Sequence, residues 1–235
     1  MDARTGRDAG ADDGAARFAA ELRDLKRRGC HVLVAGRVGD AVRARQTRNL
    51  LGSPRLPRYR ILALVDGELA EARTYLPGNL DRDAPNVSVL DFATPVRSGA
   101  AAAPAAVQTP GEGVHAPGDE LFALRTALDR EIADGLSTVG RVPGRLRVGV
   151  LTLGILLDTY GVERTRAFAA ALGRSIRAAS GLGHCQLPLE YDAAETRALQ
   201  SAFDVRVDLR HRDGRPPEQR WRLTSTDRTT EWMLL

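Results

Sequence analysis

The chain has 235 residues, of which 43% are hydrophobic, 27% charged and 5% aromatic, a balance typical of a globular protein with an aliphatic core. The formal net charge of +4 is too small to indicate nucleic-acid binding by itself. The longest apolar run, residues 148–157, is far shorter than the roughly 20 residues of a membrane-spanning helix, and the amino terminus has no signal-peptide pattern. We therefore expect a cytoplasmic protein that does not bind a membrane.

The first half of the chain alternates predicted helices and strands. Residues 1–14 are rich in Gly, Ala and Asp, which predicts a disordered tail, and we expect residues 15–235 to form a single domain. The predicted strands are continuous apolar runs, as in a parallel sheet that is buried on both faces. Helices are predicted at residues 15–28 and 38–51, and strands at residues 30–35, 59–65 and 86–92.

A segment rich in Ala, Pro and Gly, residues 94–118, separates the two halves of the chain. It has no apolar periodicity, which predicts a flexible, linker-like insertion. A short capping segment is the alternative interpretation.

The second half continues the alternation and ends in a hairpin. Polar and apolar residues alternate over residues 205–210, a turn follows at Asp213-Gly214, and the chain returns over residues 219–223. The apolar terminal segment 232–235 could add an edge strand in cis or pair with another chain. Before the hairpin we expect a helix beginning at Asp119, a strand at 145–152, a helix at 162–179, a strand at 183–189 and a short helix at 192–201.

These elements predict an α/β fold in which a central, mostly parallel sheet is flanked by helices and ends in a C-terminal antiparallel hairpin. Parallel sheets of this kind bind ligands at the carboxyl ends of their strands. The first candidate is the turn after the strand at residues 30–35, where Gly36 stands between a buried strand and a helix. This is the position of a P-loop.

The turn departs from the P-loop pattern, G-x-x-x-x-G-K-[ST], at three positions. Counted from Gly36, the second glycine, the lysine and the hydroxyl fall on Ala41, Val42 and Arg43. Valine cannot offset phosphate charge, and arginine would repel the Mg²⁺ that the hydroxyl holds. We interpret the segment as a degenerate phosphate loop that consists of Gly36, Arg37, Gly39, Ala41, Val42 and Arg43.

The acid that would bind Mg²⁺ is also replaced. It is expected at the end of the strand at 145–152, where the sequence has Leu151. The four histidines are scattered and both cysteines lie in apolar runs, so we expect neither a metal site nor a cofactor.

Several segments together resemble a KaiC/RadA-type RecA domain, and in particular a group of uncharacterised KaiC-like domains of unknown function found in haloarchaea. The resemblance implies a RecA-like, P-loop-NTPase-type fold. It also places Asp66 and Glu68 roughly where KaiC-like ATPases have water-activating acids, the alternative being loop acids in solvent. The segments are LKRRGCHVLVAG (25–36), RILALVDG (60–67), LLDTYG (156–161), GLGHCQLPL (181–189), AFDVRVDLRHRDG (202–214) and EQRWRL (218–223).

Arginines are concentrated next to the glycine turn. Residues 37–60 contain seven arginines and a single acid. Arg37 and Arg43 flank the turn and a helix amino terminus, and Arg45 and Arg48 are one helical turn apart, which is typical of an anion-binding site. The alternative is a solvated face in an arginine-biased sequence.

We therefore expect a non-catalytic pseudo-ATPase, not an enzyme, that serves as a regulatory or interaction scaffold for protein partners. The alternative is an arginine-rich module that binds a nucleotide or, weakly, a nucleic acid without hydrolysis. An enzyme with an unrecognised site is a third, less supported hypothesis. RecA-like rings rest on ATP bound between subunits, so the oligomeric state stays open.

Overall fold

A computed structural model of the chain describes residues 5–64, 72–78, 80–91, 119–151 and 153–235. It confirms the mixed α/β class, with a single eight-stranded sheet in the order β3-β2-β4-β5-β1-β6-β7-β8. The six strands from β3 to β6 are parallel, whereas β7 is antiparallel to β6 and β8 to β7. The strands are β1 Cys30–Ala35, β2 Tyr59–Leu64, β3 Val87–Asp91, β4 Leu146–Val150, β5 Leu182–Leu187, β6 Val205–Arg210, β7 Glu218–Leu223 and β8 Met233–Leu234.

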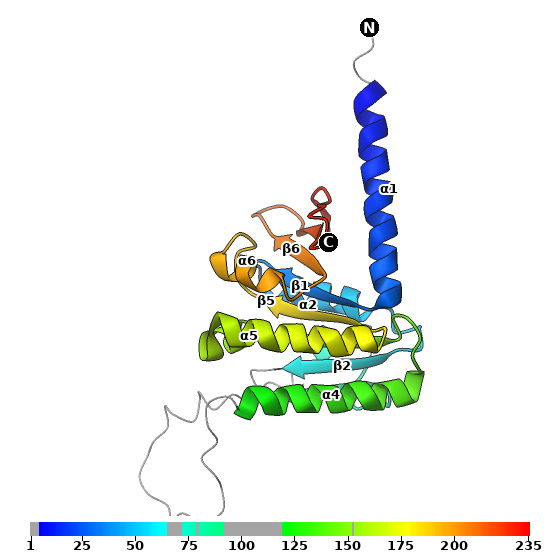
Figure 1. The fold of residues 1–235 in the computed structure, drawn as a ribbon, viewed down its shortest axis with the longest axis vertical. Helices are drawn as coiled ribbons and strands as arrows, with labels where there is room; N and C mark the ends of the chain where they lie inside the picture. Colours follow the sequence, from blue (N-terminus) through cyan, green and yellow to red (C-terminus); the bar gives the residue numbers. More distant parts are fainter. Residues whose placement is uncertain (1–4, 65–71, 79, 92–118, 152) are drawn as a thin grey trace, which may run out of the picture.

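Helices cover both faces of the sheet. Helices α4, α5 and α6 pack on one face, with α4 and α5 side by side, and α1, α2 and α3 pack on the other (Figure 1). The helices are α1 Thr5–Arg28, α2 Asp40–Leu51, α3 Ala72–Tyr75, α4 Asp119–Val139, α5 Leu153–Ala178 and α6 Ala194–Gln200.

Three helical segments differ from the sequence-based expectations. Helix α1 begins at Thr5, so most of the expected tail at residues 1–14 is helical. The short helix α3 was not expected, and α5 begins nine residues before the predicted start at Val162. Gly161 has non-helical backbone angles inside α5 (φ 75°, ψ 171°). This kink interrupts the helical periodicity, so the sequence predicted only the part of the helix that follows it. The predicted insertion at 94–118 lies outside the described residues.

The continuous apolar runs follow from burial on both faces of the sheet. In β2, Ile61 and Ala63 pack in the cluster under α4 and α5, whereas the alternate residues Leu62 and Leu64 pack in the cluster under α2 and α3. Each face therefore needs apolar side chains at alternate positions, and the strand as a whole becomes apolar.

Two histidines lie fully buried in the centre of the sheet. The His31 ring packs against the Phe203 ring at a tilt of 37°, with 4.4 Å between ring centroids, and its Nε2 lies 3.4 Å from the Cys185 Sγ. Burial lowers the pKa of His31 and of His184 to about 3, because neither ring can be hydrated when charged.

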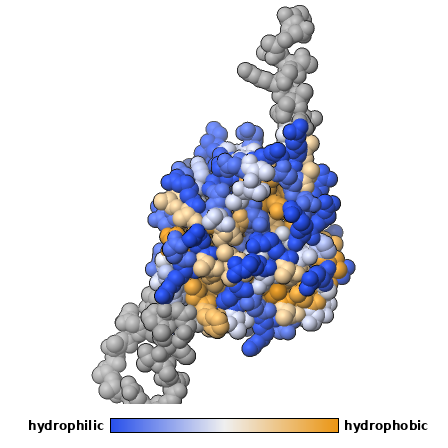
Figure 2. Space-filling model, viewed as in Figure 1, coloured by the Kyte–Doolittle hydropathy of each residue, from blue (hydrophilic) through white to orange (hydrophobic). Residues whose placement is uncertain are grey.

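The face of the molecule seen in Figure 2 is predominantly polar. Figure 2 shows hydrophilic residues over most of the visible face, with smaller hydrophobic patches between them. Among the helices described, none has the length and apolar character needed to cross a membrane.

The buried histidines predict acid-sensitive stability. In the unfolded chain both take up protons below their ordinary pKa of 6.5, whereas the folded chain binds them only near pH 3. Stability should therefore fall between pH 6.5 and pH 3, by about 1.4 kcal/mol per histidine per pH unit. Urea unfolding of His184→Asn at several pH values should show a reduced slope. The same substitution at the exposed His211 is the control and should leave the slope unchanged.

Candidate functional site

The turn between β1 and α2 lies at the carboxyl edge of the sheet, where the sequence predicted a phosphate loop. Strand β1 lies between β5 and β6, and Ala35 is paired with Leu187 on one side and with Asp208 on the other. Gly36 follows with a φ of 150°. A Cβ at this position would lie 2.3 Å from the Leu209 carbonyl oxygen, so the glycine allows the turn to contact β6 directly.

The amino terminus of α2 already has an acidic residue beside it. The helix begins at Asp40 after Gly39, which provides no side-chain cap. The Asp40 carboxylate forms an ion pair with Arg43. A negative side chain in the first turn stabilises the positive end of a helix, and it also repels an anion that approaches the same end.

Val42, at the position of the P-loop lysine, is part of the hydrophobic core. Its side chain is 6% exposed and lies in the same cluster as Val34 and Leu209, between α2 and the sheet. Its neighbour Ala41 is exposed. The position that would reach a phosphate is therefore directed into the protein interior.

Leu151, at the position of the Mg²⁺-binding acid, is also a core residue. Its side chain is 3% exposed and packs in the cluster that contains Ala44 and Leu62, and its backbone N–H donates to the Ala63 carbonyl at 3.0 Å. A carboxylate at this position would be buried among aliphatic side chains.

Little space remains between these elements. A recess lined by Gly36, Arg43, Gln186 and Leu209 has no room for a water molecule. Gln186 closes it from β5, because its Nε2 donates to the Arg43 carbonyl at 2.9 Å and to the Thr47 hydroxyl. Among the described residues, this recess beside the turn leaves no room for a phosphate group.

The side chains of the four arginines predicted to bind an anion do not converge on one site. Arg43 pairs with Asp40, and Arg48 donates to the Thr74 carbonyl at the end of α3. Arg37 and Arg45 are exposed, and neither side chain forms a hydrogen bond or ion pair with a residue that the structure describes. Arg43 also lies about 140° around α2 from Arg48, so these two side chains do not share a face. Asp66 and Glu68 lie outside the described residues.

A charged cluster next to the turn was not predicted from the sequence. The fully buried Asp208 accepts from Arg206 Nε at 2.6 Å and from Arg220 Nη2 at 2.9 Å. Trp232 lies against the guanidinium groups of Arg210 and Arg220, at 3.9 and 4.6 Å from its ring centroid. The carboxyl terminus is thus held on its own sheet through β8, so the cis pairing of the two alternatives is observed.

The same cluster continues along the hairpin. Arg210 and Arg212 donate to the Glu218 carboxylate, and these hydrogen bonds lower the pKa of Glu218 to about 2. Opposite charges at alternate positions of β6, Arg206 and Asp208, were the available sequence signal. The alternation was interpreted only as a strand of the hairpin, whereas α6 and the carboxyl terminus cover the charged side chains.

The architecture is that of a mixed α/β protein whose carboxyl-edge turn is packed shut. The chain belongs to the DUF7504 family, a family of unknown function, whose sequence model matches residues 29–209. This range runs from Gly29, just before β1, to Leu209 and so contains both sides of the contact between Gly36 and β6. Comparison with curated proteins gave no match. No group of three or more His, Cys, Asp or Glu side chains that could hold a metal ion occurs in the described part of the chain.

The contact between Gly36 and β6 predicts that substituting Gly36 destabilises the fold more than substituting Gly39 in the same turn. Gly36→Ser would force a side chain against the Leu209 carbonyl and should lower the free energy of unfolding by about 2–4 kcal/mol. Gly39→Ser is the control, since nothing lies within 4 Å of its Cβ position and serine is a favourable helix cap. Equal stability of the two variants in urea unfolding would contradict the close packing of Gly36 on β6.

Proposed function

We propose that this chain is a non-catalytic RecA/KaiC-like domain, in which the phosphate-loop position has become hydrophobic core and the domain serves as a regulatory or protein-interaction scaffold. The observation that carries the proposal is the burial of Val42 and Leu151, at 6% and 3% exposure, where a nucleotide-binding domain has its lysine and acid.

The electrostatics of the turn support the absence of catalysis. A Mg²⁺-triphosphate complex needs a cation near its β- and γ-phosphates and oxygen ligands for the metal. Val42 provides neither, the neighbouring cation, Arg43, is paired with Asp40, and the recess beside Gly36 is filled. Restoring one residue would not restore the site, because the space is also missing.

The architecture supports the RecA-like part of the proposal. The chain has the mostly parallel sheet, the glycine turn after its first strand and the terminal antiparallel hairpin that the resemblance implies. None of these features is specific alone, because other α/β folds have parallel sheets and glycine turns.

Two exposed features support the scaffold role. The amino-terminal part of α1 extends beyond the body of the molecule (Figure 1). Phe18, near the middle of this helix, packs on the core. On α4, the Phe122 side chain is 73% exposed. An extended helix and an exposed aromatic residue are surfaces that a protein partner could cover.

The burial of Val42 provides the test. Val42→Lys restores the lysine of the P-loop pattern, yet it should place an unpaired charge in the core and lower the free energy of unfolding by at least about 3 kcal/mol. Ala41→Lys, at the exposed neighbouring position, should change stability by less than about 0.5 kcal/mol. Neither variant nor the wild type should release phosphate from Mg-ATP. A Val42→Lys variant as stable as wild type, or one stabilised by Mg-ATP, would refute the proposal.

A further inference from the structure

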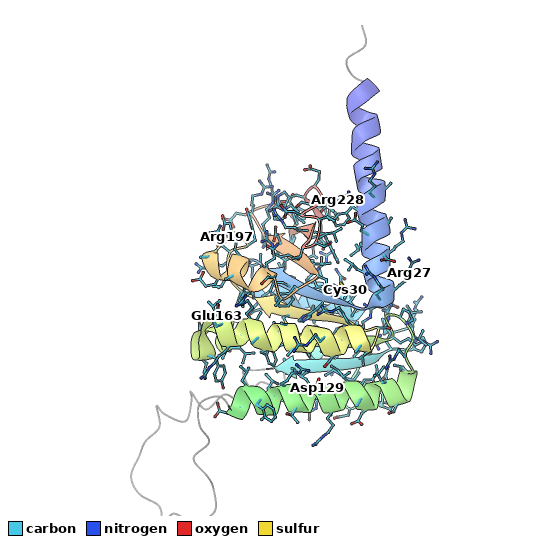
Figure 3. The ribbon with its side chains drawn as sticks, in the orientation of Figure 1. Arg27, Cys30, Asp129, Glu163, Arg197 and Arg228 are labelled. Carbon is cyan, nitrogen blue, oxygen red and sulfur yellow. The ribbon has the colours of Figure 1, made fainter. Side chains whose placement is uncertain are left out.

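A second cavity lies at the opposite, amino edge of the sheet. Its volume is about 560 Å³, and it lies between the carboxyl ends of α1 and α2 and the beginnings of β4 and β5. In Figure 3, Arg27 and Cys30 mark the junction of α1 and β1 near this edge. The volume is within the range of roughly 300–1,000 Å³ that is usual for small-molecule sites.

The lining of this cavity is basic. Four cationic side chains reach it, those of Lys26, Arg27, Arg58 and Arg147, and none of the described residues that line it is acidic. Lys26 and Arg27 are exposed at the mouth, whereas Arg58 and Arg147 are half-buried. Lys26 is also the only lysine of the chain.

Two of these cations have an ion pair or hydrogen bonds that give them a structural role. Arg27 forms an ion pair with Asp24 on the outer face of α1. Arg147 donates to the Gly144 carbonyl at 2.8 Å and to the Leu50 carbonyl at 3.1 Å, so it caps the carboxyl end of α2. The buried Arg60 behind them donates to the Ser53 carbonyl at 2.7 Å. These contacts are structural.

Lys26 and Arg58 have no such explanation. Among the described residues, the Lys26 ammonium has only the Trp221 ring, at 5.8 Å from its centroid, and the Arg58 guanidinium has no hydrogen bond or ion pair. The Arg58 Nη1 lies against Gly52 at the end of α2, where a Cβ would approach it to 1.8 Å. A glycine at this position therefore leaves room for the guanidinium.

A buried polar group also faces the cavity without a partner. Gln46, on α2, is 1% exposed and lines the cavity, and its amide oxygen forms no hydrogen bond within the described part of the chain. Leaving a buried amide oxygen without a hydrogen bond is unfavourable, and a ligand that donates a hydrogen bond to it would remove this penalty.

The cations also destabilise one another. Partial burial at the mouth of the cavity lowers the pKa of Lys26, and the nearby Arg147 lowers it further. Burial, followed by Arg58 and Arg60, lowers the pKa of Arg147 to about 10. A bound anion would reverse this mutual repulsion, and arginine is the side chain best suited to phosphate.

We propose that this cavity binds a small phosphate-bearing molecule of about the size of a nucleoside monophosphate. Arg58 and Lys26 contact the phosphate, and Gln46 accepts a hydrogen bond from the ligand. The planar group of the ligand lies beside the Trp221 ring, whose Nε1 donates to Gln219 at 2.9 Å. The volume of about 560 Å³ suits a small molecule better than a polymer. The proposal is independent of the proposed function, because the carboxyl-edge turn contributes no residue to this cavity.

Isothermal titration calorimetry of the full chain with AMP tests the proposal, with inorganic pyrophosphate, adenosine and citrate as comparison probes. AMP and pyrophosphate should bind saturably, whereas adenosine should not bind and citrate should bind at least about tenfold more weakly than pyrophosphate. Arg58→Gln should weaken AMP binding at least about tenfold, since it removes a charged hydrogen bond, and Lys26→Gln at the exposed mouth should weaken it about threefold or more. Arg45→Gln, on the exposed face of α2 and outside the cavity, is the matched control and should change nothing.

Five results would overturn the proposal. One is no saturable binding of AMP or pyrophosphate, and another is AMP binding that neither Arg58→Gln nor Lys26→Gln weakens. Citrate binding as tight as that of pyrophosphate would indicate a general anion site. A short single-stranded DNA that competes with AMP and binds more tightly would indicate a nucleic-acid site. If instead AMP binding were lost in Arg43→Gln alone, the ligand would occupy the Gly36 turn, and both proposals would fail.

Discussion

The direct contact between the Gly36 turn and β6 determines whether a phosphate group can bind at this turn on the carboxyl edge of the sheet. Because Gly36 has no Cβ, the turn lies against the Leu209 carbonyl, and α2 follows with Val42 directed into the core. A phosphate-binding loop instead needs open space and backbone N–H groups that point into it. In this protein packing uses that space, and the helix amino terminus that would attract an anion has Asp40 beside it.

The two edges of the sheet differ in how positive charge is compensated. At the carboxyl edge, carboxylates pair with several of the arginines, as Asp208 does with Arg206 and Arg220. At the amino edge, backbone carbonyls at the end of α2 satisfy Arg60 and Arg147, and no carboxylate of the described residues lines the cavity that Arg58 and Lys26 enter. Paired charges mainly fix structure. An unpaired, partly buried cation is unfavourable, and an anion that binds beside it stabilises it. The amino edge is therefore the better candidate for a ligand.

Local patterns predicted most of the sheet. The run Cys30–Ala35 was predicted with the bounds of β1, because a strand buried on both faces is apolar at every position, and the alternation over Val205–Arg210 predicted the hairpin strand β6. The start of α5 could not be placed, since Gly161 interrupts its periodicity. The early start of α1 was also missed, because composition alone suggested a tail.

The site was less predictable than the fold. The sequence correctly placed a glycine turn at the end of β1, but it did not indicate that Val42 and Leu151 are buried or that Arg37, Arg43, Arg45 and Arg48 serve separate contacts. The amino-edge cavity could not be predicted from the sequence, for a physical reason. Its lining comes from α1, α2, β4 and β7, and only the tertiary fold brings these segments together.

Hydrogen–deuterium exchange of the backbone amides in residues 36–43, with and without Mg-ATP, tests the central claim most directly. A turn packed shut against β6 gives ATP no access, so exchange in this segment should be the same in both conditions at millimolar nucleotide. Slower exchange of these amides when Mg-ATP is added would show that the turn opens to bind phosphate, and would contradict a carboxyl edge that is closed by packing.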